Sequence, residues 1–163
     1  MPTTLATNYL GSNAAAVLLT GGSATRIYYQ SADGSIHEAA GTGAAVNNPV
    51  YTECIVVAAE KVRINTPIAV VAWPEGNTDQ IRLYFIDKAS LLHELCSTSD
   101  TPGTWPEDFL SSRKYETAAN SGLLCAIFTT GPNIRVGYQS AAHPEVITEA
   151  TNTSSAWNQG NFA

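Results

Sequence analysis

The stretch TRIYYQSADGSIHE, residues 25–38, sets the pattern of the whole chain, because two later stretches resemble it. They are IRLYFIDKASLLHEL at 81–95 and IRVGYQSAAHPEVITEA at 134–150. Each has an arginine near its start, a β-rich run, a polar turn, and a glutamate near its end. Such runs bounded by turn residues are typical of β-strands, so each stretch predicts two strands joined by a turn.

The repeat is longer than these stretches. Their arginines, Arg26, Arg82 and Arg135, are 56 and 53 residues apart. Four short strands per unit at a period of roughly 40 to 55 residues is typical of a propeller blade. We therefore predict an all-β fold, a β-propeller with three four-stranded blades in the chain. The short apolar strands expected before the three arginines are 14–20, 67–73 and 123–129.

Helical periodicity is nearly absent from the sequence. Taken alone, segments 89–95 and 107–115 resemble helix turns. Alignment of the repeats favours a strand for 89–95, because this segment occupies the place of the third strand of a blade.

The expected blades are about 14–66, 67–122 and 123–163, in a single domain of residues 1–163. Closed propellers have roughly 4 to 8 blades, and an arc of three leaves open sheet edges. Segment 1–13 has about the length that the third blade lacks, so we expect it to complete a blade of a partner or of the ring. We predict that two chains pair about a two-fold axis into a six-bladed homodimer.

Composition excludes some classes of partner. Charged residues make up 13% of the chain and the formal net charge is −6, so no basic surface is expected for nucleic acid or anionic lipid. The apolar runs fall short of the ~20 residues that a membrane-spanning helix needs, so no membrane insertion is expected. The N-terminus lacks a basic leader, and we expect a cytoplasmic or non-classically secreted protein.

Arginine and glutamate recur together in the repeat, and two explanations are open. One is a cross-strand ion pair repeated with the blade, although surface pairs contribute only ~0 to 1 kcal/mol. The other is a sugar site, because a guanidinium offers a fork of donors and a carboxylate offers acceptors to adjacent hydroxyls. The pairs are Arg26 with Glu38, Arg82 with Glu94, and Arg135 with Glu149, at separations of twelve, twelve and fourteen residues.

A sugar site also needs a cover for the apolar face of the ring. Trp105 and Trp157 lie on the outer, variable segment of their units and are suited to this role. His37 and His93 precede two of the glutamates, but strand alternation places each on the opposite face from its neighbour. We therefore expect no metal and no other cofactor.

The units, written IRxYxQ…IxE with a following Trp, resemble the blades of the Aleuria-type fungal fucose-specific lectins. These are six-bladed propellers in which Arg and Glu of one blade bind the sugar hydroxyls and aromatic residues of the next blade pack on its ring. The resemblance covers all three repeats and implies binding of L-fucose, on fucosylated glycans and glycoproteins. It implies three sites: Arg26 and Glu38 with Trp105; Arg82 and Glu94 with Trp157; Arg135 and Glu149 with Tyr51 of a partner chain.

The chain departs from the family pattern at two points. Trp157 follows its glutamate by the family's usual eight residues, whereas Trp105 follows by eleven. By this spacing, the site with Trp157 matches the family most fully. A second aromatic is frequent three residues after the glutamate in the family, and here these positions are Gly41, Ser97 and Asn152.

The sequence gives less support to functions other than that of a lectin. The chain has no GxSxG, HExxH, P-loop or dinucleotide motif. Each repeat offers one carboxylate beside a guanidinium, which is a poor general acid for a glycosidase. We therefore expect no enzymatic activity. A propeller that serves as a protein-interaction scaffold, with structural Arg and Glu pairs, and a lectin for another sugar remain alternatives.

Overall fold

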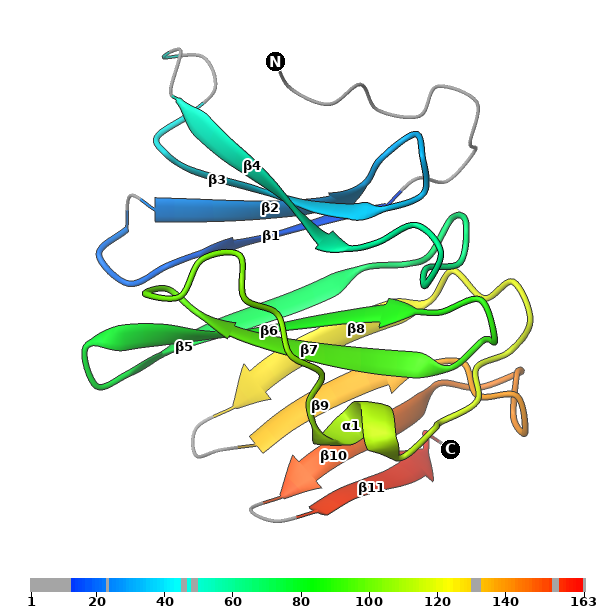
Figure 1. Cartoon of the computed structure of the whole chain (residues 1–163). Helices are drawn as coiled ribbons and strands as arrows, with labels where there is room; N and C mark the ends of the chain where they lie inside the picture. The colour runs from blue at the N-terminus through cyan, green and yellow to red at the C-terminus, as the bar shows by residue number, and fades with distance from the viewer. Residues whose placement is uncertain are drawn as a thin grey trace.

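The chain folds into three antiparallel sheets that lie one after another (Figure 1). The predicted all-β propeller architecture is confirmed by these sheets. No helix among the described residues is long and apolar enough to cross a membrane. The expectation that segment 1–13 completes a blade falls, apart from Asn13, outside the described residues. The computed structural model describes residues 13–22, 24–44, 47, 50–129, 133–153 and 156–162.

The first and third sheets each have four strands in an up-and-down order among the described residues. The first sheet consists of β1 (Ala14–Leu18), β2 (Ala24–Gln30), β3 (Ile36–Thr42) and β4 (Tyr51–Val57). The third consists of β8 (Leu124–Thr129), β9 (Asn133–Tyr138), β10 (Thr148–Thr153) and β11 (Ala156–Asn161). Each arginine of the repeat therefore lies on the second strand of its sheet and each glutamate on the third.

The second sheet departs from this order. Within the described residues it has three strands, and the segment after β7 runs beside β7 without continuing the ladder. The Cys96 N–H donates to the Pro106 carbonyl at 3.0 Å, but Pro106 has no N–H to return a bond. The chain then turns into a helix of four residues. The elements are β5 (Ala69–Glu75), β6 (Thr78–Ile86), β7 (Leu92–Thr98) and α1 (Phe109–Ser112).

Both segments with helix-like sequences can now be placed. Most of 89–95 belongs to strand β7, as the alignment of repeats indicated. Segment 107–115 contains α1, whose N-cap is Asp108: its carboxylate accepts a hydrogen bond from the Phe109 N–H at 2.8 Å. Asp is a preferred residue at this position because its side chain satisfies a backbone donor at the helix start.

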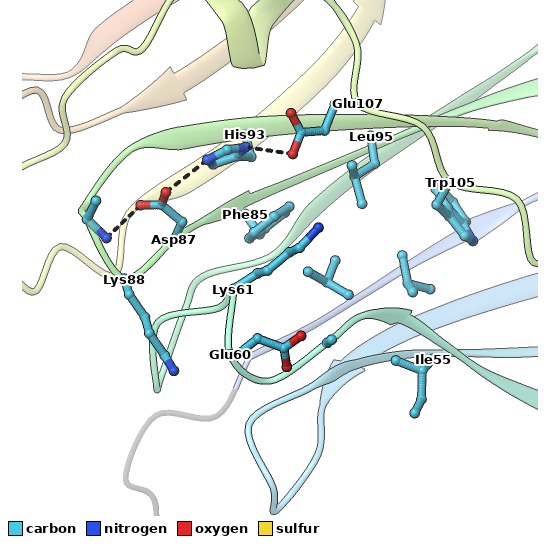
Figure 2. Close-up of a pocket in the computed structure, with 14 residues that line it drawn as sticks. Ile55, Glu60, Lys61, Phe85, Asp87, Lys88, His93, Leu95, Trp105 and Glu107 are labelled. Carbon is cyan, nitrogen blue, oxygen red and sulfur yellow. Dashed lines mark hydrogen bonds and ion pairs between the residues drawn. The ribbon is translucent and has the colours of Figure 1, made fainter.

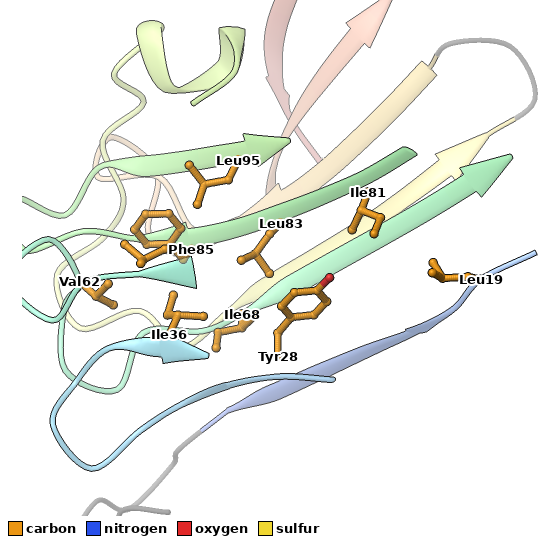
Figure 3. Close-up of a cluster of buried hydrophobic side chains, with 10 residues drawn as sticks. Leu19, Tyr28, Ile36, Val62, Ile68, Ile81, Leu83, Phe85 and Leu95 are labelled. Atoms are coloured by element: carbon orange, nitrogen blue, oxygen red, sulfur yellow. The ribbon is translucent and has the colours of Figure 1, made fainter. Parts of the chain in front are cut away.

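Strand alternation divides the core into two layers. On β6, the side chains of Ile81, Leu83 and Phe85 face the first sheet and form one buried cluster with Tyr28 and others (Figure 3). The residue between two of them, Tyr84, faces the third sheet and belongs to the second cluster. The middle sheet is therefore apolar on both faces, whereas each outer sheet has one face turned away from it.

The first strands of the three sheets, β1, β5 and β8, hold the sheets together. β5 lies between β1 and β8. Asp79 is buried, and its carboxylate accepts hydrogen bonds from the backbone N–H of Thr20, at 3.0 Å, and from the Thr20 hydroxyl. These bonds tie the turn before β2 to the start of β6, so they fix the first blade relative to the second.

The outer faces of the first and third sheets carry exposed apolar side chains. On β1, Leu18 is 59% exposed, and on β8, Ile127 is 55% exposed. Alternate residues of the same strands, such as Val17 and Phe128, pack against the core instead. We call the two outer faces the first free face, which contains Leu18, and the third free face, which contains Ile127.

Candidate functional site

The first Arg and Glu pair lies between the first and second blades. The Arg26 Nε is 3.9 Å from the Glu38 Oε2, and both side chains are largely buried. The Tyr28 hydroxyl donates to the same carboxylate oxygen at 2.8 Å. Burial and the nearby carboxylate raise the pKa of Tyr28 well above its usual range, so its hydroxyl stays protonated and remains a donor. The carboxylate thus has one close donor, Tyr28, and a longer ion pair with Arg26.

Trp105 contacts the tyrosine of this pair. Its ring meets the ring of Tyr28 edge to face, with centroids 5.6 Å apart and planes at 87°. The indole Nε1 is buried and has no hydrogen-bond partner among the described residues. The structure therefore places Trp105 against Tyr28, the residue that donates to Glu38, although Trp105 follows its glutamate at an unusual spacing.

A groove borders the same tryptophan and extends along the junction of the first two blades (Figure 2). Its volume is about 580 Å³. On its wall the His93 Nε2 is 3.0 Å from an Asp87 carboxylate oxygen, and its Nδ1 is 3.9 Å from Glu107. We call this the Trp105 groove; its other lining residues include Ile55, Val57, Lys61, Phe85, Lys88 and Leu95.

The second pair is arranged differently, because Arg82 and Glu94 each bind the chain's own segment after β7. The salt bridge of Arg82 among the described residues is with Asp108, at 3.2 Å from Nε to Oδ2. Its guanidinium also lies 5.1 Å from the centre of the Trp73 ring, within range of a cation–π contact.

Glu94 is buried beneath α1, and each of its carboxylate oxygens has a donor. The Tyr84 hydroxyl donates to Oε1 at 2.7 Å, and the Leu110 N–H donates to Oε2 at 3.2 Å. Burial, and to a smaller extent the charge of Asp108, raise the pKa of Glu94 to about 7 against the opposing effects of these donors and Arg82. Trp157 is 2% exposed in the adjoining cluster.

The third pair lies on the third free face and is the most open. The Arg135 Nε donates to the Glu149 Oε2 at 2.8 Å, and Nη2 is 2.6 Å from the same oxygen. The Arg135 side chain is 44% exposed and that of Glu149 21%. The hydrogen bond from Arg135 holds the pKa of Glu149 below its usual range. A hollow of about 260 Å³ lies beside Glu149 and is bordered by Asn158 and Phe162.

Tyr51 lies at the other end of the arc, on β4 of the first sheet. It pairs across the ladder with Gly41, whereas Glu38 pairs with Cys54. Positions 38 and 41 point to opposite sides of β3, so Tyr51 lies on the first free face. One chain therefore does not bring Tyr51 to Arg135. The sequence prediction pairs them across two chains, and the geometry leaves that prediction open.

Gly41 also has a packing reason to be a glycine. A Cβ added there would lie 2.6 Å from the Tyr51 Cδ1, closer than side chains allow. The tyrosine on the neighbouring strand thus covers the position where the sequence pattern lacks an aromatic residue. No cluster of three or more potential metal ligands was found among the residues that the structure describes.

One functional feature escaped the sequence reasoning. Tyr28 and Tyr84 are buried in the core, and each also donates to the glutamate of its own blade. The constant separation of ten residues between tyrosine and glutamate in these two blades is a signal that could have revealed this bond. The third blade differs, since the residue opposite Glu149 is Gly137, and the neighbouring Tyr138 donates to Gln159 at 2.6 Å.

Comparison with known families and structures adds independent information. Residues 10–163 match the family model for fungal fucose-specific lectins. The fucose-specific lectin of Aleuria aurantia is 29% identical over 126 residues, which cover 75% of this chain and 38% of that protein.

Two solved structures are similar in fold. AofleA from Arthrobotrys oligospora is 27% identical with a TM-score of 0.76, over 92% of this chain and 41% of that one. The Aleuria aurantia lectin, described as a six-bladed β-propeller with a novel fucose recognition mode, is 29% identical with a TM-score of 0.78, over 99% of this chain and 51% of that one. The chain thus spans about half the length of these relatives, or less.

Proposed function

Because the chain belongs to the fungal fucose-specific lectin family, we propose that it binds L-fucose on fucosylated glycans and glycoproteins and catalyses no reaction. The observation that supports this proposal is the first site, where Arg26 faces Glu38 and Trp105 of the next blade packs on Tyr28, the donor to Glu38. A guanidinium that donates and a carboxylate that accepts fit two neighbouring hydroxyls of a pyranose. The indole ring fits the apolar face and the methyl group of fucose.

The Trp105 groove gives the rest of a glycan a place beside this site. Its apolar floor includes Phe85 and Leu95, and its rim carries Lys61, Lys88 and Glu107. Sugars beyond the fucose present both apolar faces and hydroxyls, which suit such a mixed lining. Fucosylated di- and trisaccharides are therefore expected to bind more tightly than methyl α-L-fucoside.

A third site forms if a second copy of the chain closes the ring. Arg135 and Glu149 lie on the third free face and Tyr51 on the first free face, as a site shared by two chains requires. Leu18 and Ile127, exposed on the same two faces, give this closure apolar area to bury. We include in the proposal a six-bladed homodimer, in which several weak sites on one ring bind a glycan surface by avidity.

Retention on immobilised L-fucose tests the proposal. The chain is expected to bind and to be eluted by free L-fucose but not by galactose. Arg26→Ala is expected to weaken retention at the first site, because the buried Glu38 carboxylate then loses its cationic partner and the sugar loses its guanidinium. Arg113→Ala, an exposed arginine at the end of α1, is the matched control and should be retained like the native chain. Equal elution by galactose would favour a lectin for another sugar.

A further inference from the structure

We propose that the second of the repeated sites is filled by the chain's own residues 108–110, which take the place of a sugar and leave this site without a ligand. This inference rests on the proposed function, because a filled site has meaning only where the equivalent sites bind. It concerns Arg82 and Glu94, which the sequence groups with Trp157 in the site whose spacing from glutamate to tryptophan matches the family.

In a sugar site, Glu94 would accept hydrogen bonds from hydroxyls. Its two oxygens already accept from the Tyr84 hydroxyl and from the Leu110 N–H. The tyrosine bond has a counterpart in the first site, but the bond from Leu110 comes from the segment after β7 and occupies the second oxygen. Each oxygen keeps a second lone pair, but Glu94 is only 2% exposed and the Leu110 backbone lies on Oε2, so a sugar hydroxyl has no open approach from that side.

In a sugar site, Arg82 would donate hydrogen bonds to the sugar hydroxyls. Its Nε faces the Asp108 carboxylate at 3.2 Å, and Nη1 donates to the Gln80 side chain at 3.2 Å and to the Ile81 carbonyl at 3.0 Å. A sugar hydroxyl is a neutral acceptor, and a carboxylate is a stronger one for a guanidinium. A sugar would therefore have to displace Asp108 at a loss.

The apolar wall of the second site, which Trp157 would supply, is covered by Leu110. Leu110 is fully buried in the same cluster as Trp157, which is 2% exposed. A leucine side chain thus covers the apolar region that a sugar ring and its methyl group would need. Exchanging this packed contact for a sugar would also expose Leu110 to water.

The segment is also held in place by bonds to the backbone of Glu94, which do not involve the side chains of the site. The Asp108 N–H donates to the Glu94 carbonyl at 3.0 Å. The Ser111 hydroxyl accepts from the Glu94 N–H at 2.9 Å and donates to the Glu94 carbonyl at 3.0 Å. These bonds fix the start of α1 directly over the carboxylate, so the filling of the site is part of the fold of the second blade.

The first site shows what the second lacks. There, Glu38 accepts from Tyr28 on Oε2, while Oε1 has the Cys54 thiol at 3.9 Å, a long contact with a weak donor. The segment that follows β3 is the strand β4, which pairs with it from Gly41 to Ile36 with a register shift between His37 and Ile36. No helix covers this glutamate, and Arg26 has no carboxylate other than Glu38 within salt-bridge distance among the described residues.

Titration calorimetry with methyl α-L-fucoside tests the proposal on a matched pair of nearly isosteric variants, Glu38→Gln and Glu94→Gln. We expect Glu94→Gln to keep the number of sites per chain and the affinity of the native protein within about twofold. We expect Glu38→Gln to lose one site per chain. A loss of one site in Glu94→Gln as well would overturn the inference while leaving the proposed function intact.

A crystal of the native chain soaked in methyl α-L-fucoside gives a readout that needs no variant. Sugar density beside Arg26 and Glu38, with Leu110 still bonded to Glu94, is the expected result. Sugar bonded to Glu94 with Leu110 displaced would overturn the inference alone. No binding of the fucoside to the native chain in either experiment would overturn both the proposed function and this inference.

Discussion

The buried Glu94 should make stability depend on pH in a direction opposite to that of most carboxylates. Its pKa rises from an ordinary value of 4.5 to about 7 in the folded chain. Between these values the folded state holds a proton on Glu94 that the unfolded state does not. The free energy of unfolding therefore falls as the pH rises through this window. The contribution of Glu94 is fully present below about pH 4.5 and is lost by about pH 7.

The size of the effect follows from the two pKa values. A difference of about 2.5 pKa units corresponds to on the order of 3 kcal/mol, since each unit is about 1.4 kcal/mol. The charged groups that face Glu94 are Arg82 and Asp108. Their opposing effects on the carboxylate are already contained in this difference.

Urea unfolding of the native chain and of Glu94→Gln at pH 4.5, 5.5, 6.5 and 7.5 measures the effect. Subtracting the two curves cancels the titration of all other groups. The native chain should lose about 3 kcal/mol relative to the variant across the window. Glu149→Gln is the control: the pKa of Glu149 is lowered rather than raised, so this variant should keep the native slope in the window. Parallel curves for the native chain and Glu94→Gln would refute the reasoning.

Three further predictions concern packing and assembly. Asp79→Ala should lower the free energy of unfolding by about 1–3 kcal/mol in urea titration, because it leaves backbone and hydroxyl donors of the first blade without their buried acceptor; unchanged stability would contradict this. Gly41→Ala should cost about 1–3 kcal/mol through contact with Tyr51, whereas Gly122→Ala, which meets nothing within 4 Å, should be nearly neutral; equal effects would contradict the packing. If the proposed homodimer closes through the third free face, Ile127→Asp should make the chain monomeric in sedimentation velocity without unfolding it; a dimer that persists in the variant would contradict this interface.

The fold could be predicted because its signal is repeated. The spacing of Arg26, Arg82 and Arg135 fixed which residues share a position in the blade. The order of strands within each repeat then placed each arginine on a second strand and each glutamate on a third, as the sheets confirm. The same alignment correctly placed most of 89–95 in a strand against its local helical propensity. Local preference was the weaker signal because the blade context decides the packing of that segment.

The contents of the second site could not be predicted in the same way. The repeats align Glu94 with Glu38, but segment 107–115 does not form a strand like β4, which takes the same place in the first blade. Whether Asp108 reaches Arg82 depends on the path of that segment around Pro106, and this path is set by hydrogen bonds to β7. Spacing alone therefore favoured the site with Trp157, whereas the geometry favours the one with Trp105.

The most direct measurement for the whole account is isothermal titration of the native chain with methyl α-L-fucoside, with methyl α-D-galactoside as the control. The account predicts heat of binding from the fucoside alone, with fewer sites per chain than the three Arg and Glu pairs of the sequence. Absence of heat from the fucoside, or equal binding of the galactoside, would contradict it. The repeated arginines and glutamates would then be ion pairs that hold the blades together.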